Sequence, residues 1–343
     1  MEGTQKKPIF KLLKNLLFFI GLVVLTFWLI FKDQDMLELY KIVNSVDKKY
    51  IIFGIMMMLG YYLTESYNIK CMVKVLENKK ISIFSAFKYT LIGFFFSSIT
   101  PSSSGGQAVE IYYMNKDGIS YANATMALLI HLCGLQISII LLGVVGAIIY
   151  PVALSNVLWL FILGIILNGI VLSIILIGVF SHTLSQKLVQ LYIKILKLFK
   201  VKNIDEKATS LNEGLQRYHE GAEFIKSNKI EFIKSVTRVV IQLLIYHSVT
   251  FFVYRAFGLS DYNYWQITAI QAVFFTSVSG LPLPGAIGAS EAVFLKIYDG
   301  VFSETLLSGA MLLSRGIMFY LFIVISLVVV LINAFKTKDL KIK

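Results

Sequence analysis

The sequence predicts an all-α integral membrane protein with six long transmembrane helices and two re-entrant helical hairpins. Of its 343 residues, 57% are hydrophobic and 15% are charged, and the mean hydropathy is +0.75. Soluble globular domains carry about 25% charged residues. Several apolar runs also reach the roughly 17 to 25 residues that a helix needs to cross a bilayer. We therefore expect a single membrane domain, residues 1–343.

Six uninterrupted apolar runs are predicted to be transmembrane helices. In chain order they are residues 12–31, 51–69, 122–150, 157–180, 232–257 and 306–335. The first run follows a lysine-rich start, is long, and is not followed by a small-residue cleavage site. We therefore expect it to be a retained signal anchor rather than a cleaved signal peptide.

Two further apolar regions, residues 83–114 and 267–297, are interrupted at mid-length by proline and glycine. Lysine-rich loops favour the cytoplasmic side of a membrane. If the first region crossed the membrane once, the lysine-rich stretch 187–229 would lie outside. A re-entrant hairpin instead places this stretch and both termini in the cytoplasm. The same logic makes the second region a hairpin that enters from the opposite side.

The two interrupted regions resemble each other at an offset of 181 residues. This offset aligns Pro101 with Pro282 and Glu110 with Glu291 without a gap. With the flanking spans, it predicts a first repeat at residues 51–150 and a second, inverted repeat at residues 232–335. Inverted repeats are typical of transporters.

The predicted repeats are joined by a cytoplasmic linker at residues 181–231. Its first part, from Thr183, has leucines at helical spacing and lysines on another face. Such a helix is attracted to the anionic lipids of the inner leaflet. The alternative is a solvated helical linker.

Irregular backbone at membrane depth is tolerated only where it is packed in protein or lines a wet cavity. The stretch TPSSSGGQAVEIYYMN, from Thr100, should end one half-helix and start another, whose N-terminus attracts anions. The candidate substrate-binding residues of this first tip are Pro101, Ser102, Ser103, Ser104, Gly105, Gly106 and Glu110. Those of the second tip are Pro282, Pro284, Gly285, Gly288 and Glu291. The alternative is that both tips are tight packing turns.

Charged residues in the apolar segments add to the candidate site. A charge near the bilayer centre costs at least about 2.5 kcal/mol and marks a functional site by default. We expect Arg315 to meet a substrate phosphate, and Glu291 and Glu110 to meet a cationic group or one another's basic partners. The alternative is a structural ion pair between Arg315 and Glu291. Glu65 is interpreted as a membrane-interface residue, and His131 as a core histidine.

The sequence lacks the signatures of metal, nucleotide and redox enzymes. Cys71 and Cys133 are far apart and form no CxxC motif, the histidines have no ligand spacing, and no Gly-rich phosphate loop is present. We therefore expect no catalytic residues, no metal, no cofactor and no nucleic-acid partner.

The motifs TPSSSGGQAVEIYYM and SGLPLPGAIGASEAVF, in this multi-span arrangement, resemble the lysylphosphatidylglycerol synthase transmembrane family. This family is the flippase-like membrane half of multiple-peptide-resistance proteins. The resemblance covers nearly the whole chain. It implies a translocase in a bacterial-type cell (plasma) membrane that carries aminoacylated phosphatidylglycerol to the outer leaflet. Such activity lowers the negative surface charge and is linked to resistance against cationic antimicrobials.

The sequence departs from full-length members of that family in one respect. They carry a large soluble C-terminal domain that lysylates phosphatidylglycerol, whereas this sequence ends at IKIK after its last predicted span. We therefore expect the chain to move the lipid, with a separate synthase as a partner. The alternatives are a phosphatidylglycerol lysyltransferase or its membrane subunit, and a small-solute or ion transporter.

Overall fold

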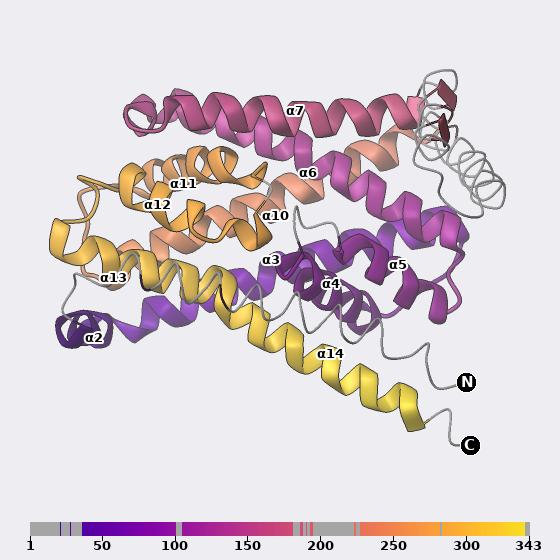
Figure 1. The fold of residues 1–343 in the computed structure, drawn as a ribbon, viewed down its shortest axis with the longest axis horizontal. Coiled ribbons are helices and arrows are strands. Elements are labelled where there is room, and N and C mark those ends of the chain that lie inside the picture. Colours follow the sequence, from indigo (N-terminus) through magenta and orange to yellow (C-terminus); the bar gives the residue numbers. More distant parts are fainter. Residues whose placement is uncertain are drawn as a thin grey trace.

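The computed structural model describes residues 36–100, 105–180, 227–281 and 283–339, together with isolated positions outside these ranges. Every regular element within them is helical (Figure 1). The elements are α2 (Met36–Ser45), α3 (Lys48–Glu77), α4 (Ile83–Ser98), α5 (Gly106–Lys116), α6 (Tyr121–Ile149), η2 (Pro151–Leu154), α7 (Leu158–Phe180), α10 (Lys229–Ala256), α11 (Tyr264–Ser279), η3 (Pro284–Ala286), α12 (Ala289–Ile297), α13 (Glu304–Arg315), η4 (Gly316–Tyr320) and α14 (Leu321–Asp339).

Four helical stretches of the described chain are long and apolar enough to cross a membrane. They are Tyr121–Ile149, Leu158–Leu176, Lys229–Ala256 and Glu304–Asn333. They correspond to the last four predicted spans. Helix α3 contains the second predicted span and is 30 residues long, but Glu65, Asn68 and several tyrosines make it more polar. The first predicted span, residues 12–31, lies almost wholly outside the described residues, as does most of the predicted linker 181–231.

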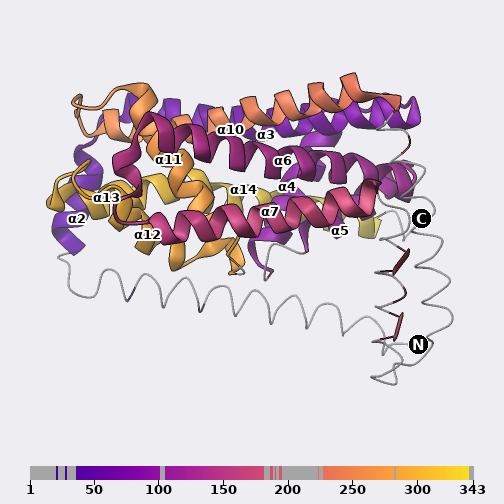
Figure 2. The ribbon, with the colours of Figure 1, turned by 90° about the horizontal axis from the view of Figure 1, so that it is seen from above.

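Helices α3 and α10 lie side by side along one side of the bundle (Figures 1 and 2). Helix α6 packs against both of them, and α7 packs against α6 and α11. Helix α14 packs against α4. Many large apolar side chains on α7 and α14 face outward, as expected for helices that contact lipid. This arrangement encloses the polar faces of α3 and α10.

Each interrupted region folds as two helices separated by a non-helical break. Helices α4 and α5 pack against each other, as do α11 and α12, and the two pairs lie toward opposite ends of the bundle (Figure 1). Helix α4 spans Ile83–Ser98 and α11 spans Tyr264–Ser279, so both bounds differ by 181 positions. Their N-caps, Ser82 and Asn263, are related by the same offset, which is the one that the sequence analysis found.

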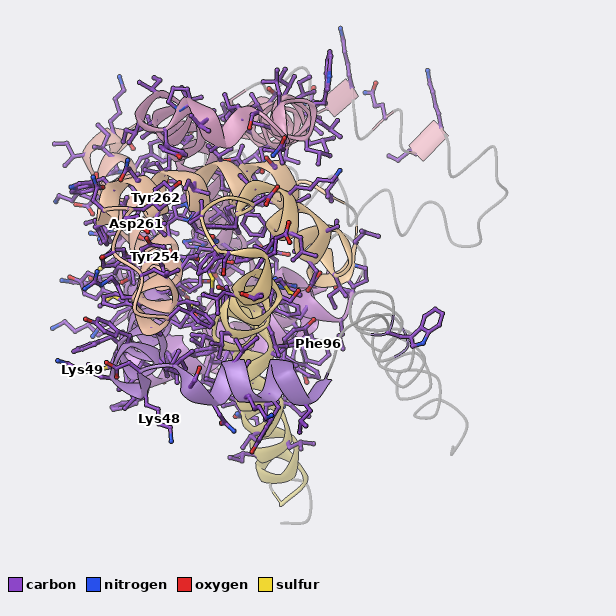
Figure 3. All side chains as sticks on the ribbon, turned by 90° about the vertical axis from the view of Figure 1, so that its left-hand side faces the viewer. Lys48, Lys49, Phe96, Tyr254, Asp261 and Tyr262 are labelled. Carbon is purple, nitrogen blue, oxygen red and sulfur yellow. The ribbon has the colours of Figure 1, made fainter. Side chains whose placement is uncertain are left out.

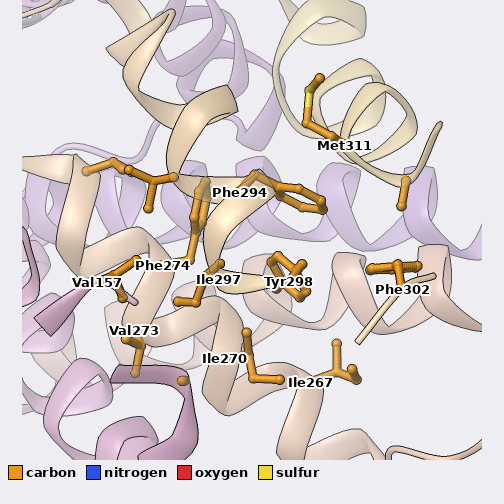
Figure 4. Packing of buried hydrophobic residues seen from close by; sticks show 14 of the residues in the cluster. Val157, Ile267, Ile270, Val273, Phe274, Phe294, Ile297, Tyr298, Phe302 and Met311 are labelled. Atoms are coloured by element: carbon orange, nitrogen blue, oxygen red, sulfur yellow. The ribbon is translucent and has the colours of Figure 1, made fainter. Parts of the chain in front are cut away.

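Aromatic packing fixes the α11–α12 pair within the bundle. Phe294 and Tyr298 of α12 stack with their ring centroids 4.3 Å apart, and Phe274 of α11 meets Phe294 edge-on at 6.0 Å (Figure 4). All three side chains are buried. Such aromatic pairs contribute about 0.5–1.5 kcal/mol beyond the area that they bury. These contacts therefore hold α11 and α12 together within the bundle.

Two connections meet at one end of the bundle, which carries Lys48, Lys49 and Asp261 (Figure 3). The N-cap residue Asp47 donates its backbone N–H to the carbonyl of Ala256 at 2.9 Å, which ties the start of α3 to the end of α10. The residues before α3 and those after α10 therefore lie at the same end.

The turn between α5 and α6 is held by charged groups. The carboxylate of Asp117 accepts hydrogen bonds from Lys88 Nζ at 2.7 Å and from the Tyr89 hydroxyl. Lys79 Nζ donates to the carbonyls of Asp117 and Gly118 at 2.9 Å. Burial alone raises the pKa of Asp117, but these hydrogen bonds and the lysine charges more than offset it and lower the pKa below its ordinary value.

Replacing Asp117 by Asn should lower the stability at neutral pH by about 0.2–1 kcal/mol, the range of exposed ion pairs. Because the folded-state pKa of Asp117 is lowered, its stabilisation is fully present above the unfolded-state value of about 3.9 and is lost as pH falls below it. The difference between D117N and the wild type should therefore shrink in acid. Thermal unfolding in detergent from about pH 6 to pH 3 measures this. Asp261→Asn, an exposed position at the opposite end, is the control.

Candidate functional site

The tip of the second hairpin is a short turn between α11 and α12. It contains η3, in which Gly285 has a φ of 57°, and it ends at Gly288 with a φ of 84°. Glycine adopts this left-handed region without the steric cost that other residues pay. A Cβ atom at Gly285 would also lie 2.1 Å from Cζ of Phe319. The turn therefore requires glycine at position 285 for both its conformation and its space.

Glu291 lies in the first turn of α12 and is 1% exposed. Its Oε2 accepts a hydrogen bond from the backbone N–H of Gly288 at 2.7 Å. This contact satisfies one of the N–H groups that a helix N-terminus leaves unpaired, and the helix dipole favours the negative charge there. The carboxylate is thus fixed at the hairpin tip by its own helix.

Arg315, the last residue of α13, neutralises this carboxylate. Its Nε donates to Glu291 Oε1 at 2.9 Å, and its Nη2 donates to the Gly285 carbonyl at 3.1 Å. The guanidinium carbon lies 4.4 Å from the ring centroid of Phe319. The Tyr320 hydroxyl adds a hydrogen bond to Glu291 Oε1 at 3.3 Å. We call these five residues the Glu291 cluster.

A π-helical turn, η4, positions two of the five residues of the Glu291 cluster. It directly follows Arg315 and contains both Phe319 and Tyr320. A π turn inserts an extra residue into a helix and changes the direction of the side chains beside it, and such turns are frequent at functional sites. Here, all three side chains on this stretch reach the tip of the second hairpin.

The structure thus brings together several residues that the sequence analysis named. Arg315, Glu291 and Gly285 belong to the Glu291 cluster, Gly288 donates its backbone N–H to Glu291, and the buried Pro284 starts the turn beside it. The Arg315–Glu291 ion pair, the alternative role for these two residues, is present. Five candidate residues, namely Pro101, Ser102, Ser103, Ser104 and Pro282, lie outside the described residues.

The first hairpin places Glu110 at the equivalent position of α5. Gly106 starts this helix, and the backbone N–H of Gly105 donates to Thr100 Oγ1 at 3.0 Å. Glu110 is 6% exposed, and its carboxylate lies over Gly93 of α4, where a Cβ would come within 1.8 Å of Oε1. Within the described ranges, Glu110 makes no hydrogen bond and no ion pair.

The two hairpin tips adjoin. Phe95 and Ile99, at the end of α4, pack in one buried cluster with Ile287 of the second tip and with Phe319. Element η3 also contacts α4. The candidate residues of the two hairpins therefore belong to one region of the bundle and not to two separate sites.

A buried polar network that the sequence analysis did not assemble crosses α3, α6 and α10. Arg238 Nη1 donates to Asn68 Oδ1 at 3.3 Å, and the Asn68 amide contacts His131 Nδ1 at 3.2 Å. Nε2 of His131 lies 3.8 Å from Glu65 Oε1, and Gln242 Nε2 donates to Glu65 Oε2 at 2.9 Å. We call these residues the Glu65 network.

The Glu65 network adds contacts that the sequence did not indicate. The Glu65 side chain is only 16% exposed and lies between helices. His131 is buried and hydrogen-bonded, as expected for a core histidine, and it is also a member of a polar chain. The signal that was available is the spacing of Tyr61, Glu65 and Asn68, which places all three on one face of a helix.

Comparison with protein families gives one match over most of the chain. The family model described as the lysylphosphatidylglycerol synthase TM region matches residues 15–326. No curated protein matches the sequence.

Proposed function

Because the chain belongs to the lysylphosphatidylglycerol synthase TM-region family, we propose that it is a membrane lipid translocase (flippase). Its substrate is an aminoacylated or anionic phospholipid, such as lysylphosphatidylglycerol, which it moves between leaflets. The observation that carries this proposal is the Glu291 cluster, a buried ion pair held at the tip of a broken helix. Such a pair is expensive in a membrane, where intramembrane charges mark substrate pathways.

The arrangement of the helices supports alternating access between the two leaflets. In the proposal, α4–α5 and α11–α12 are re-entrant hairpins of an inverted repeat. The helix bounds that share the offset of 181 and the positions of the two hairpins toward opposite ends of the bundle support it. Transporters with inverted repeats bind substrate near the bilayer midplane, at discontinuous helices.

The chemistry of the candidate residues fits a zwitterionic or cationic headgroup. Arg315 can exchange Glu291 for the lipid phosphate as its partner. A guanidinium forms paired hydrogen bonds with both carboxylates and phosphates. Glu291 and Glu110 can then meet the amines of the headgroup. The charges of Arg315 and Glu291 therefore stay compensated throughout this exchange, which avoids the large cost of an unpaired buried ion. The helix N-termini at Gly106 and Gly288 add donors for the phosphate.

Lipid movement in proteoliposomes tests the proposal. Labelled lysylphosphatidylglycerol should exchange between leaflets in the presence of the wild-type chain. The double variant Glu291→Gln/Arg315→Met removes both charges together. We expect it to fold yet to transport at least about tenfold more slowly, a loss of about 1.4 kcal/mol in transition-state stabilisation. The exposed Asp261→Asn variant should transport normally. Exchange that is equal with and without protein would refute the proposal.

Lysyl transfer is the second candidate, because the family description names a synthase. It predicts that the purified chain, given lysyl-tRNA and phosphatidylglycerol, forms the lysylated lipid. The translocase proposal instead assigns that step to a separate synthase.

The translocase proposal also places the chain in a bacterial-type plasma membrane with both termini in the cytoplasm, where residues 181–231 contact anionic lipids. Uptake or currents carried by a small solute without lipid movement would favour a solute transporter.

A further inference from the structure

A cavity of about 400 Å³ lies at the end of the bundle that carries Lys48, Lys49 and Asp261 (Figure 3). It is formed where the connection between α2 and α3, the end of α10 and the start of α13 come together. Small-molecule sites typically measure about 300–1,000 Å³. The lining combines polar with apolar side chains, namely those of Asp47, Tyr50, Arg255, Val46, Phe257 and Leu306. The cavity therefore has the size and the mixed lining of a site for an amphiphilic ligand.

Arg255 and Asp47 place opposite charges in the wall of this cavity. Nη1 of Arg255 donates to the Leu259 carbonyl at 3.1 Å, and the guanidinium carbon lies 5.9 Å from the ring centroid of Tyr50. Oδ1 of Asp47 accepts a hydrogen bond from the backbone N–H of Lys49 at 2.9 Å. A guanidinium has five N–H donors and a carboxylate has two acceptor oxygens, so each group keeps the capacity to bind a ligand.

Aromatic residues at the same end indicate the depth of this cavity in a membrane. The backbone N–H of Tyr262 donates to the Tyr254 hydroxyl at 3.1 Å, and the rings of Tyr262 and Tyr150 lie 6.0 Å apart. These contacts bring the end of α10 and the starts of α7 and α11 together. The first turns of α7 and α11 carry two exposed tryptophans, Trp159 and Trp265. Exposed tryptophan and tyrosine typically lie at the level of the lipid headgroups, so the cavity lies at that level too.

The lining matches the parts of a phospholipid headgroup. Arg255 can bind the phosphate, because a guanidinium forms paired, charge-assisted hydrogen bonds with phosphate oxygens. The Asp47 carboxylate can bind an amine of the headgroup in the same way. The apolar side chains of Val46 and Leu306 can contact the glycerol and the first methylene groups of the acyl chains. Asp47 would repel an inorganic phosphate ion, so a ligand that carries both charges fits this lining better.

We propose that this cavity binds a phospholipid headgroup that carries both a phosphate and an amine. Arg255 holds the phosphate and Asp47 holds the amine. As a step in the proposed lipid movement, on which this role rests, the cavity holds the aminoacylated lipid in the leaflet at this end of the bundle. In the proposed topology, this is the outer leaflet.

Native mass spectrometry of the full chain, titrated with lysylphosphatidylglycerol in detergent, tests binding without any transport assay. The Glu291→Gln/Arg315→Met background removes the charges of the other candidate headgroup site. In this background, Arg255→Gln should raise the dissociation constant at least about fivefold, because the phosphate loses its charge-assisted hydrogen bonds. Lys48→Gln removes a cation from the same end of the bundle and is the matched control, which should leave the dissociation constant unchanged. If Arg255→Gln behaved like Lys48→Gln, the proposal would be overturned.

Asp47→Asn tests the amine, because asparagine preserves the N-cap of α3 while it removes the charge. It should weaken the binding of lysylphosphatidylglycerol at least about threefold. It should not weaken the binding of phosphatidylglycerol, which lacks the amines. A similar loss for both lipids, or a loss for neither, overturns the assignment of the amine to Asp47. Excess inorganic phosphate should leave the lipid bound, whereas displacement of the lipid would show a site for free phosphate.

Transport in proteoliposomes distinguishes this proposal from the translocase function. Lipid exchange by the wild type, together with binding that neither Arg255→Gln nor Asp47→Asn weakens, removes only the headgroup site. Binding that depends on Arg255, without any lipid exchange by the wild type, removes only the translocase function.

Discussion

Replacing Arg315 by methionine should lower the free energy of unfolding by about 3–5 kcal/mol. The substitution leaves Glu291, which is 1% exposed, without its counter-ion, and it removes the donor to the Gly285 carbonyl. A buried carboxylate without its counter-ion either carries its full desolvation cost or takes up a proton, and both outcomes destabilise the folded state at neutral pH. Methionine approximates the length of the arginine stem, so the loss of packing is small.

The double variant Glu291→Gln/Arg315→Met should recover most of that loss. Replacing both members of a buried pair is often close to neutral, whereas removing one member is costly. Reversible unfolding by SDS titration in mixed micelles gives the free energies of unfolding of the wild type, the R315M variant and the double variant. Lys234→Met, which removes an exposed partner of Glu231, is the control and should cost about 0.2–1 kcal/mol. A single R315M variant as stable as this control would show that the Arg315–Glu291 contact does not hold the second hairpin.

Much of the hairpin geometry could be predicted because it is local. Proline and glycine end α4 and α11, and capping residues such as Asn263 start them, so that the break positions are written in the sequence. The offset of 181 also appears in the helix bounds. The family resemblance is confirmed by the match over residues 15–326.

The contacts between helices were harder to predict. Glu291 and Arg315 are 24 positions apart and meet only because α13 folds back and a π turn follows it. The Glu65 network joins side chains from three helices, and its hydrogen bonds bridge up to 177 positions in the sequence. No local pattern encodes which helices become neighbours. The polar face of α3 indicates that other helices must cover it. It does not indicate that His131 of α6 and Gln242 of α10 are the residues that do so.

The polar residues of α3 also explain why it is not among the four stretches that are apolar enough to cross a membrane. Glu65 and Asn68 lower its hydropathy, and α10 covers them. A helix that carries polar groups at membrane depth must bury them against other helices. The close packing of α3 against α10 and α6 is therefore a consequence of the polar network.

Gly285→Ala should lower the free energy of unfolding by about 2–4 kcal/mol. The φ of 57° costs an alanine about 1–2 kcal/mol. The new Cβ would also lie 2.1 Å from Cζ of Phe319, so this ring must move. Its displacement weakens the contact with the Arg315 guanidinium, which is worth about 0.5–2 kcal/mol. The same SDS titration measures the loss.

Two further variants separate the causes of the Gly285→Ala effect. Gly169→Ala on α7, where a Cβ would meet nothing within 4 Å, should be neutral or slightly stabilising because alanine favours helix. Phe319→Leu in the Gly285→Ala background should relieve the steric part of the loss but not the part due to φ. If Gly285→Ala behaved like Gly169→Ala, the tip would have to adopt another conformation in the membrane. The Glu291 cluster would then lack the rigid turn that holds its carbonyl against Arg315.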